Sequence, residues 1–310
     1  MQPIICIAGP TASGKTALAV ELAKVTNGEV VSCDSMQVYK YMDIGTAKPT
    51  EEEMQGIPHH MLSVAEPGED YSVSRYCKAA TPIMDDILAR GKTAIIAGGT
   101  GLYMDALIKG NDFAPYPATG RREELEELAQ KQGIEAVLEM LKKVDPESAQ
   151  RLHPSDQKRI IRAMEVYLET GQSITEHNLR TQALPPRYTP VWFALEDVDR
   201  AQLYSRIDRR VDIMLENGLI QEIRNLLSMG IPEKCTAMQA IGYKEFVDAL
   251  NGLCSIEEAA AQVQQSSRRY AKRQLTWFRR NQNIHWLRRE TGETTEEILL
   301  RARQILRESD

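Results

Sequence analysis

The part of the chain most able to do chemistry is a glycine-rich loop near the N-terminus. It has the spacing G-x-x-x-x-G-K-T, follows a short apolar run and precedes a stretch with helical spacing, the setting in which this motif binds phosphate. Backbone N–H groups and the helix N-terminus attract phosphate oxygens, the lysine adds a positive charge, and the last hydroxyl can bind Mg²⁺. The motif predicts a di- or triphosphate ligand, as in the ATP-binding and other nucleotide-binding proteins that carry it, together with Mg²⁺. The expected diphosphate-binding residues are Gly9, Pro10, Thr11, Ala12, Ser13, Gly14, Lys15 and Thr16, with Thr16 as the metal ligand.

A second acid, which an ordinary P-loop nucleotidase carries at the end of another apolar strand to hold the metal, is missing from the most obvious place. The apolar run at residues 93–97 leads into Gly98-Gly99-Thr100 without an acid. The nearest acid at the end of an apolar run is Asp34, which begins the segment D-S-M-Q-V-Y. Either Asp34 takes the metal role or the chemistry is not nucleotide hydrolysis, and the pattern alone leaves both possibilities open.

Short apolar runs alternating with helical stretches must position these residues. This alternation predicts an α/β fold, a P-loop NTPase-like parallel sheet flanked by helices. Ligands of such sheets bind beyond the carboxyl ends of the strands, so the loops that carry Gly9, Asp34 and Gly98 should meet in one crevice. The apolar runs and helical stretches lie at residues 4–8, 16–25, 29–33, 75–90 and 93–97.

From about residue 115 the pattern is helical without intervening strands, which predicts an all-helical insertion domain at residues 115–185. The catalytic core should then comprise residues 1–114 and 186–310. Capping boxes at Ser255 and Thr294 predict the starts of two late helices. The further elements expected in the core are a strand at 188–195, a helix at 199–217, a long helix to about 280, and a strand at 284–287.

Composition and charge narrow the class of protein. The 310 residues include 42% hydrophobic and 26% charged residues, which is ordinary globular usage. Five cysteines without a C-x-x-C pair favour a reduced, cytoplasmic setting, and we expect neither a targeting segment nor a membrane span. The net charge of −6 is unevenly distributed, because residues 51–70 hold six acids and no Lys or Arg, whereas residues 266–289 hold eight Arg or Lys and no acid. The second run is the candidate surface for a polyanion.

Six motifs follow one another along the chain. They are the phosphate loop at 9–16, D-S-M-Q-V-Y at 34–39, G-T-A-K-P at 45–49, G-G-T-G-L-Y at 98–103, A-I-G-Y-K-E at 240–245 and Y-A-K-R-Q-L-T-W-F-R at 270–279. Together they resemble those of the tRNA dimethylallyltransferases, also called isopentenyltransferases, in their bacterial form. The resemblance covers nearly the whole chain and implies that the phosphate loop binds dimethylallyl diphosphate instead of a nucleotide. It further implies that the acceptor is the exocyclic amine of the adenine 3′ of the anticodon, that Asp34 is the general base, and that Lys15, Thr100 and Arg210 assist catalysis.

The resemblance also implies the partner, the anticodon stem-loop of tRNA, and a monomeric enzyme. The target base of a stacked anticodon loop must be turned out to reach the crevice. Unstacked bases can then be met by stacking and by hydrogen bonds to base edges, while Lys and Arg meet the phosphates. The insertion should supply part of this surface. The residues expected to contact tRNA are Asp34, Ser35, Met36, Gln37, Lys158, Arg159, Ile160, Ile161, Arg162, Gln239, Gly242, Tyr243, Lys244, Lys272, Arg273, Gln274 and Arg279.

Other functions compete with this one. A small-molecule kinase would use ATP with Asp34 as base, a related prenyltransferase would use a free adenine nucleotide as acceptor, and an RNA-binding module would have a vestigial loop. The missing second acid and the basic run favour the tRNA enzyme. Among residues that could suggest further sites, we expect His59 and His60 to lie in a loop without metal, and Trp277 and Phe278 to be core residues.

Overall fold

The structure is a computed structural model that describes residues 4–111, 119–183 and 185–309. The chain divides into two compact units. The core unit comprises Met1–Gly110 and Arg187–Asp310, and the insertion unit comprises Asn111–Pro186. The expected start of the insertion, at residue 115, lies outside the described residues.

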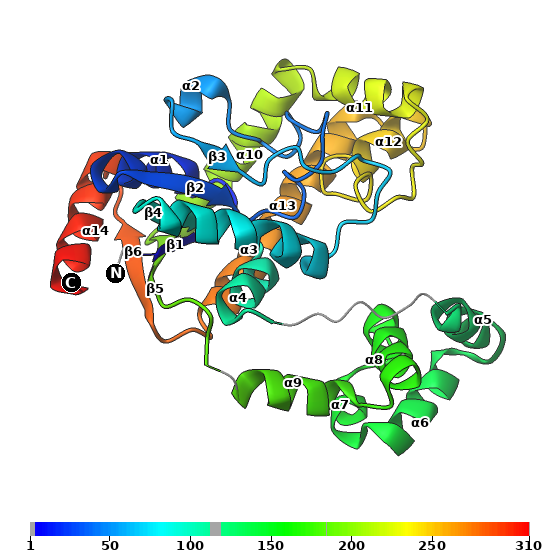
Figure 1. Ribbon diagram of the computed structural model, residues 1–310. Helices are drawn as coiled ribbons and strands as arrows, with labels where there is room; N and C mark the ends of the chain where they lie inside the picture. The colour runs from blue at the N-terminus through cyan, green and yellow to red at the C-terminus, as the bar shows by residue number, and fades with distance from the viewer. Residues whose placement is uncertain (1–3, 112–118, 184, 310) are drawn as a thin grey trace. The chain divides into compact units, whose positions relative to one another are not determined.

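The core unit is built on a six-stranded sheet with the order β3-β2-β4-β1-β5-β6, in which each neighbouring pair is parallel (Figure 1). This confirms the parallel α/β sheet predicted from the alternating apolar runs. β1 and β4 are short and mainly apolar, and all their residues but the last of β4 are buried, as expected of strands covered on both faces. The strands are β1 (Ile4–Ala8), β2 (Gly28–Ser32), β3 (His59–His60), β4 (Thr93–Ala97), β5 (Pro190–Asp197) and β6 (Ile284–Arg289).

The prediction of a loop at His59 and His60 is wrong, because these residues form the short edge strand β3 beside β2. The buried carboxylate of Glu29 on β2 explains the pairing. It accepts a hydrogen bond from His60 Nε2 at 2.8 Å and forms ion pairs with Arg90 and Lys92. These hydrogen bonds, led by that of Arg90, hold the pKa of Glu29 well below its usual range.

Helices cover both faces of the sheet. Alternate side chains of a strand point to opposite faces, and Ile5 and Phe193 share one core cluster with Leu18 of α1 and Ile298 of α14. On α3, the Tyr76 hydroxyl donates to the Ser32 carbonyl at 2.9 Å. The helices of the core unit are α1 (Lys15–Thr26), α2 (Glu51–Met54), α3 (Val73–Ala89), α4 (Gly101–Lys109), α10 (Arg200–Glu216), α11 (Leu219–Ser228), α12 (Lys244–Leu250), α13 (Ile256–Phe278) and α14 (Thr295–Ser309).

The loops that follow β1, β2 and β4 meet at one edge of the sheet, as the sequence predicted. The Gly98 N–H donates to the Ile7 carbonyl at 3.1 Å, and the Cys33 N–H donates to the Ala97 carbonyl at 2.8 Å. The Thr100 N–H in turn donates to the Cys33 carbonyl at 3.2 Å. Backbone hydrogen bonds therefore join the loop after β4 to β1 and to the loop after β2.

The insertion unit is helical throughout its described residues. Its core includes Val137, Leu141 and Ile160. Asp145 caps α7 by accepting from the Ser148 N–H at 3.0 Å, with a proline in the first turn. The helices are α5 (Arg121–Gln132), α6 (Ile134–Val144), α7 (Pro146–Arg151), α8 (Gln157–Thr170) and α9 (Ile174–Ala183).

Candidate active site

The phosphate loop joins β1 to α1. Its geometry requires glycine at two places, since Gly14 has φ 89° and a Cβ at Gly9 would lie 3.0 Å from the Leu195 carbonyl oxygen. The ammonium of Lys15, the first residue of α1, donates to the Pro10 carbonyl at 2.7 Å and so lies over the loop. The Ser13 hydroxyl is buried and has no hydrogen-bond partner in the described part of the chain. This loop has the donors of an anion site and a polar atom that a ligand could satisfy.

Helix α10 brings further cations to the loop. The Arg210 guanidinium donates to the Thr11 hydroxyl at 3.3 Å, and Arg206 donates to the Ala12 carbonyl at 3.0 Å. Burial, followed by the nearby Arg210 charge, lowers the pKa of Lys15 to about 7, although Asp34 opposes the shift. Burial also lowers the pKa of Arg210. The clustered cations therefore favour an anionic ligand, which would restore a charged Lys15.

Asp34 lies directly beyond β2 and faces the same site. Its Oδ1 accepts hydrogen bonds from the N–H groups of Met36 at 2.8 Å and Gln37 at 3.4 Å, which fixes the turn. Within residues 4–111, 119–183 and 185–309 no group donates to its Oδ2. Thr100 supports this turn, because its Oγ1 accepts from the Ser35 N–H at 3.0 Å. One carboxylate oxygen is thus held while the other is available to a ligand.

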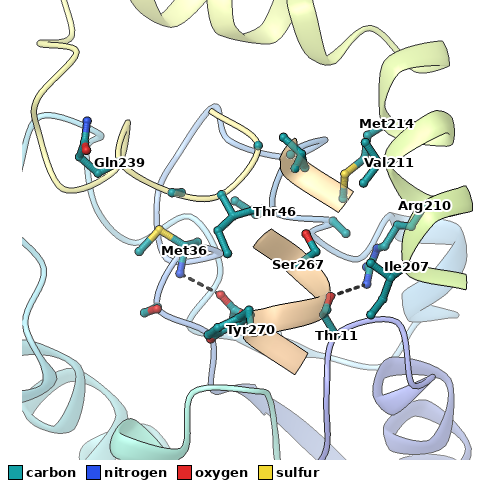
Figure 2. Close-up of a pocket in the computed structure, with 18 of the residues that line it drawn as sticks. Thr11, Met36, Thr46, Ile207, Arg210, Val211, Met214, Gln239, Ser267 and Tyr270 are labelled. Atoms are coloured by element: carbon teal, nitrogen blue, oxygen red, sulfur yellow. Dashed lines mark hydrogen bonds between the residues drawn. The ribbon is translucent and has the colours of Figure 1, made fainter. Parts of the chain in front are cut away.

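Two adjoining cavities open at this edge of the sheet. One, of about 520 Å³, lies over the phosphate loop and includes Lys15 and Thr16 in its lining. The other, of about 300 Å³, is mainly apolar (Figure 2). Its apolar lining comprises Met36, Ile207, Val211, Met214, Ala240, Ile241 and Val263. Both cavities are lined by Thr11, Asp34, Thr46, Ala47, Arg210 and Tyr270.

The sequence did not reveal Tyr270 as a site residue. It lies on α13 at the boundary of the two cavities, beside Thr100 and Asp34. Burial raises the pKa of its phenol to about 12, so the hydroxyl stays neutral and can donate a hydrogen bond near neutral pH. The sequence signal that could have identified Tyr270 as a site residue is its place in the Y-A-K-R-Q motif.

Glu222 on α11 was also missed, and no motif marks it. Its carboxylate accepts from the N–H groups of Asp43 and Ile44, both at 2.8 Å, and of Gly45 at 3.1 Å. It also accepts from the Tyr243 hydroxyl at 2.7 Å. Four hydrogen bonds thus fix the loop that leads to Thr46, a wall of both cavities.

Several expected RNA contacts need correction because their side chains are buried. Ile160 and Ile161 are core residues of the insertion unit, so α8 cannot present them to RNA. Tyr243 is buried, and its ring packs so closely on Gly45 that a Cβ there would lie 2.5 Å away. Gly242, which has no side chain, lines the apolar cavity. Gln274 is 5% exposed and hydrogen-bonded to backbone.

The remaining expected RNA residues lie at the cavities or on the surface. Ser35, Met36 and Gln239 line the apolar cavity, and Gln37 lines the phosphate cavity. On α13, Phe278 is buried as expected, and Trp277 is half-buried against Gly101. The exposed basic residues are Lys158, Arg159 and Arg162 on α8, Lys244 on α12, and Lys272, Arg273 and Arg279 on or next to α13.

Comparison with known proteins identifies the family. A family model described as IPP transferase matches residues 37–281, and one described as isopentenyl transferase matches residues 2–65. A tRNA dimethylallyltransferase from Caldanaerobacter subterraneus subsp. tengcongensis is 49% identical over 297 residues, which cover 95% of this chain and 94% of that protein. One from Acetivibrio thermocellus is 44% identical over 300 residues, 96% of each chain.

Solved structures agree with the sequence comparisons. A tRNA isopentenylpyrophosphate transferase from Bacillus halodurans has a TM-score of 0.74 and 42% identity, covering 99% of this chain and 96% of that chain. A eukaryotic dimethylallyltransferase acting on tRNA has a TM-score of 0.80 and 32% identity, and the match covers 93% of this chain and 74% of that chain. No helix in the described part of the chain is long and apolar enough to cross a membrane. The chain belongs to the tRNA dimethylallyltransferase family of prenyltransferase enzymes.

Proposed function

We propose that this enzyme transfers the dimethylallyl group of dimethylallyl diphosphate to the exocyclic amine of the adenine 3′ of the tRNA anticodon, releasing diphosphate. The observation that carries the proposal is the junction of a cationic phosphate cavity with an apolar cavity, with Asp34 lining both. A donor with an anionic head and a short branched hydrocarbon tail matches this pair of cavities. ATP would instead place a polar ribose and base against the apolar wall.

The residues can be given roles in one displacement step. The adenine amine attacks the allylic carbon, a C–N bond forms, the C–O bond breaks, and its electron pair leaves with the diphosphate. Asp34 accepts the amine proton, which contributes on the order of 10²- to 10⁴-fold because the amine lone pair is delocalised and weakly nucleophilic. Lys15 and Arg210 stabilise the negative charge that grows on the leaving group. Thr100 positions the Asp34 turn through the Ser35 N–H.

The loop also fits a Mg²⁺ ion. Mg²⁺ in phosphate sites prefers hydroxyl, water and phosphate oxygens with one or two protein ligands. Ser13 Oγ is a buried, unpartnered oxygen in this loop, and no group of three His, Cys, Asp or Glu in the described residues could hold a metal by itself. Thr16 lines the phosphate cavity, and we assign its hydroxyl, together with the diphosphate oxygens, as the Mg²⁺ ligands. Bound Mg²⁺ would neutralise charge on the leaving diphosphate.

The RNA surface is proposed from charge and exposure. Lys272 and Arg273 lie on α13 and are exposed, and Arg273 also lines the apolar cavity. Lys158 and Arg159 provide exposed cations on α8 of the insertion unit. These cations would meet the phosphates of the anticodon stem-loop, while the target adenine turns out of its stack at a cost of a few kcal/mol.

The testing experiment follows radiolabel from dimethylallyl diphosphate, with Mg²⁺, into an unmodified anticodon stem-loop and, in parallel, into AMP. Label in the RNA alone supports the proposal. Label in AMP would assign the enzyme to nucleotide prenylation, and label in neither, together with tight ATP binding, would favour a kinase. A stem-loop with guanine in place of the target adenine is the matched control and should remain unlabelled.

A further inference from the structure

The buried side chain of Gln274 makes two hydrogen bonds that join separate loops of the site. Its side-chain Oε1 accepts from the Thr11 N–H of the phosphate loop at 2.9 Å. Its Nε2 donates to the Gly99 carbonyl, beyond β4, at 3.0 Å. One side-chain amide on α13 therefore bridges the loops that follow β1 and β4, with its donor on one loop and its acceptor on the other.

Gln274 lies directly against the glycines that follow β4. A Cβ at Gly99 would lie 2.1 Å from Gln274 Nε2, so a side chain there would displace the amide. A Cβ at Gly98 would lie 2.0 Å from the Cys33 carbonyl oxygen, which belongs to the backbone before Asp34. The glycines at the end of β4 therefore leave the space that the Gln274 amide occupies.

The Gln274 bridge extends toward the proposed base. Gly99 is followed by Thr100, whose N–H donates to the Cys33 carbonyl at 3.2 Å and whose Oγ1 accepts from the Ser35 N–H at 3.0 Å. Asp34 lies between Cys33 and Ser35. A displacement of the Gly99 carbonyl would therefore shift both backbone contacts that flank Asp34.

We propose that Gln274 is a positioning residue that fixes the separation between the diphosphate and the Asp34 carboxylate, an inference that rests on the proposed prenyl transfer. Both polar atoms of its amide are engaged with backbone, so it acts through Thr11 and Thr100. The amide supplies both a donor and an acceptor from one planar group. Glutamate would keep the Thr11 contact and repel the Gly99 carbonyl, and leucine would keep neither contact.

The experiment compares Gln274→Glu and Gln274→Leu with wild type and with Gln265→Leu, a matched control on the exposed side of the same helix. It measures kcat, the KM of the stem-loop, the affinity for inorganic diphosphate without RNA, and the melting temperature. Both Gln274 variants should lose about 10- to 100-fold in kcat, since small misplacements of reacting groups have such effects, with little change in stem-loop KM. Both variants should also weaken diphosphate binding, Gln274→Leu because it loses the Thr11 contact and Gln274→Glu because it brings a negative charge to the lining of the phosphate cavity. The control should match wild type.

Two results would overturn the inference. If the stem-loop KM rises while diphosphate affinity and kcat stay at the wild-type values, Gln274 contacts RNA, as its motif first indicated. If both variants match the control, the two hydrogen bonds of Gln274 are dispensable for catalysis. If Gln274→Leu does not fold, Gln274→Glu alone decides by its kcat. A wild type that transfers no label would refute the proposed function instead, and diphosphate binding would still test the Thr11 contact separately.

Discussion

The lowered pKa of Lys15 predicts that donor binding depends on pH in an unusual range. A pKa of about 7 means that free Lys15 is half protonated at pH 7 and about one-tenth protonated at pH 8. The bound diphosphate supplies negative charge beside the ammonium and so raises this pKa again. Above pH 7 the donor is fully ionised, because phosphate groups lose their last proton near pH 6. Any change of donor affinity with pH above 7 should therefore come from the protonation of Lys15 and not from that of the donor.

The expected magnitude follows directly. Donor affinity should fall about tenfold for each pH unit above 7, and binding at pH 8 should take up about 0.9 proton per donor. Titration calorimetry with dimethylallyl diphosphate, at fixed Mg²⁺ in buffers of different ionisation enthalpy, measures both quantities. Lys15→Arg is the matched control, because arginine stays protonated throughout, so it should show weaker binding without proton uptake.

A flat affinity between pH 6.5 and 8.5 without proton uptake would refute this reasoning, because Lys15 would then be charged before the donor arrives. The same pKa shift has a defined sign for folding. The unfolded chain keeps a lysine proton up to its usual value near 10.5, whereas folded Lys15 loses it near 7. The contribution of Lys15 to the free energy of unfolding, which is destabilising at low pH, should therefore become less unfavourable as the pH rises from about 7 to about 10.5.

Three variants give further tests. Asp34→Asn should lower kcat by about 10²- to 10⁴-fold with stem-loop affinity unchanged, as single-turnover transfer and gel-shift assays can show; an equal loss of RNA affinity would remove its assignment as base. Replacing Lys272 and Arg273 with alanine should weaken stem-loop binding and reduce the magnitude of its log–log salt slope by about 2, and an unchanged slope would place α13 outside the interface. Glu222→Gln loses acceptors for the loop before Thr46, so it should destabilise the fold by about 1.5–3 kcal/mol and raise donor KM. An unchanged melting temperature and KM would contradict that role.

The sequence predicted most of the sheet because its signals are local. The apolar runs at Ile4–Ala8 and Thr93–Ala97 have the observed bounds, and the phosphate loop lies between the strand and helix that its motif requires. Strand β3 could not be foreseen in the same way. Two histidines have no strand pattern of their own, and they pair with β2 where His60 meets the buried Glu29.

The site was predicted less completely, because a motif does not say which atoms of a residue face a ligand. Tyr243 and Gln274 belong to motifs, yet their side chains fix loops from inside the fold. Ile160 lies among basic residues in sequence, but helical periodicity directs it into the core. Glu222 has no local signal at all, since its partners at Asp43 to Gly45 are about 180 residues away in the chain.

Helix α13 shows why the basic run and the motif coincide. Tyr270, Gln274 and Trp277 recur at helical spacing and contact the site loops and Gly101, so one face of the helix is engaged inside the core unit. Lys272 and Arg273 lie on the exposed face. An acid on that face would repel RNA, whereas a change on the inner face would move the loops. The two faces should therefore separate experimentally: outer variants should change salt dependence and affinity, and inner variants should change kcat.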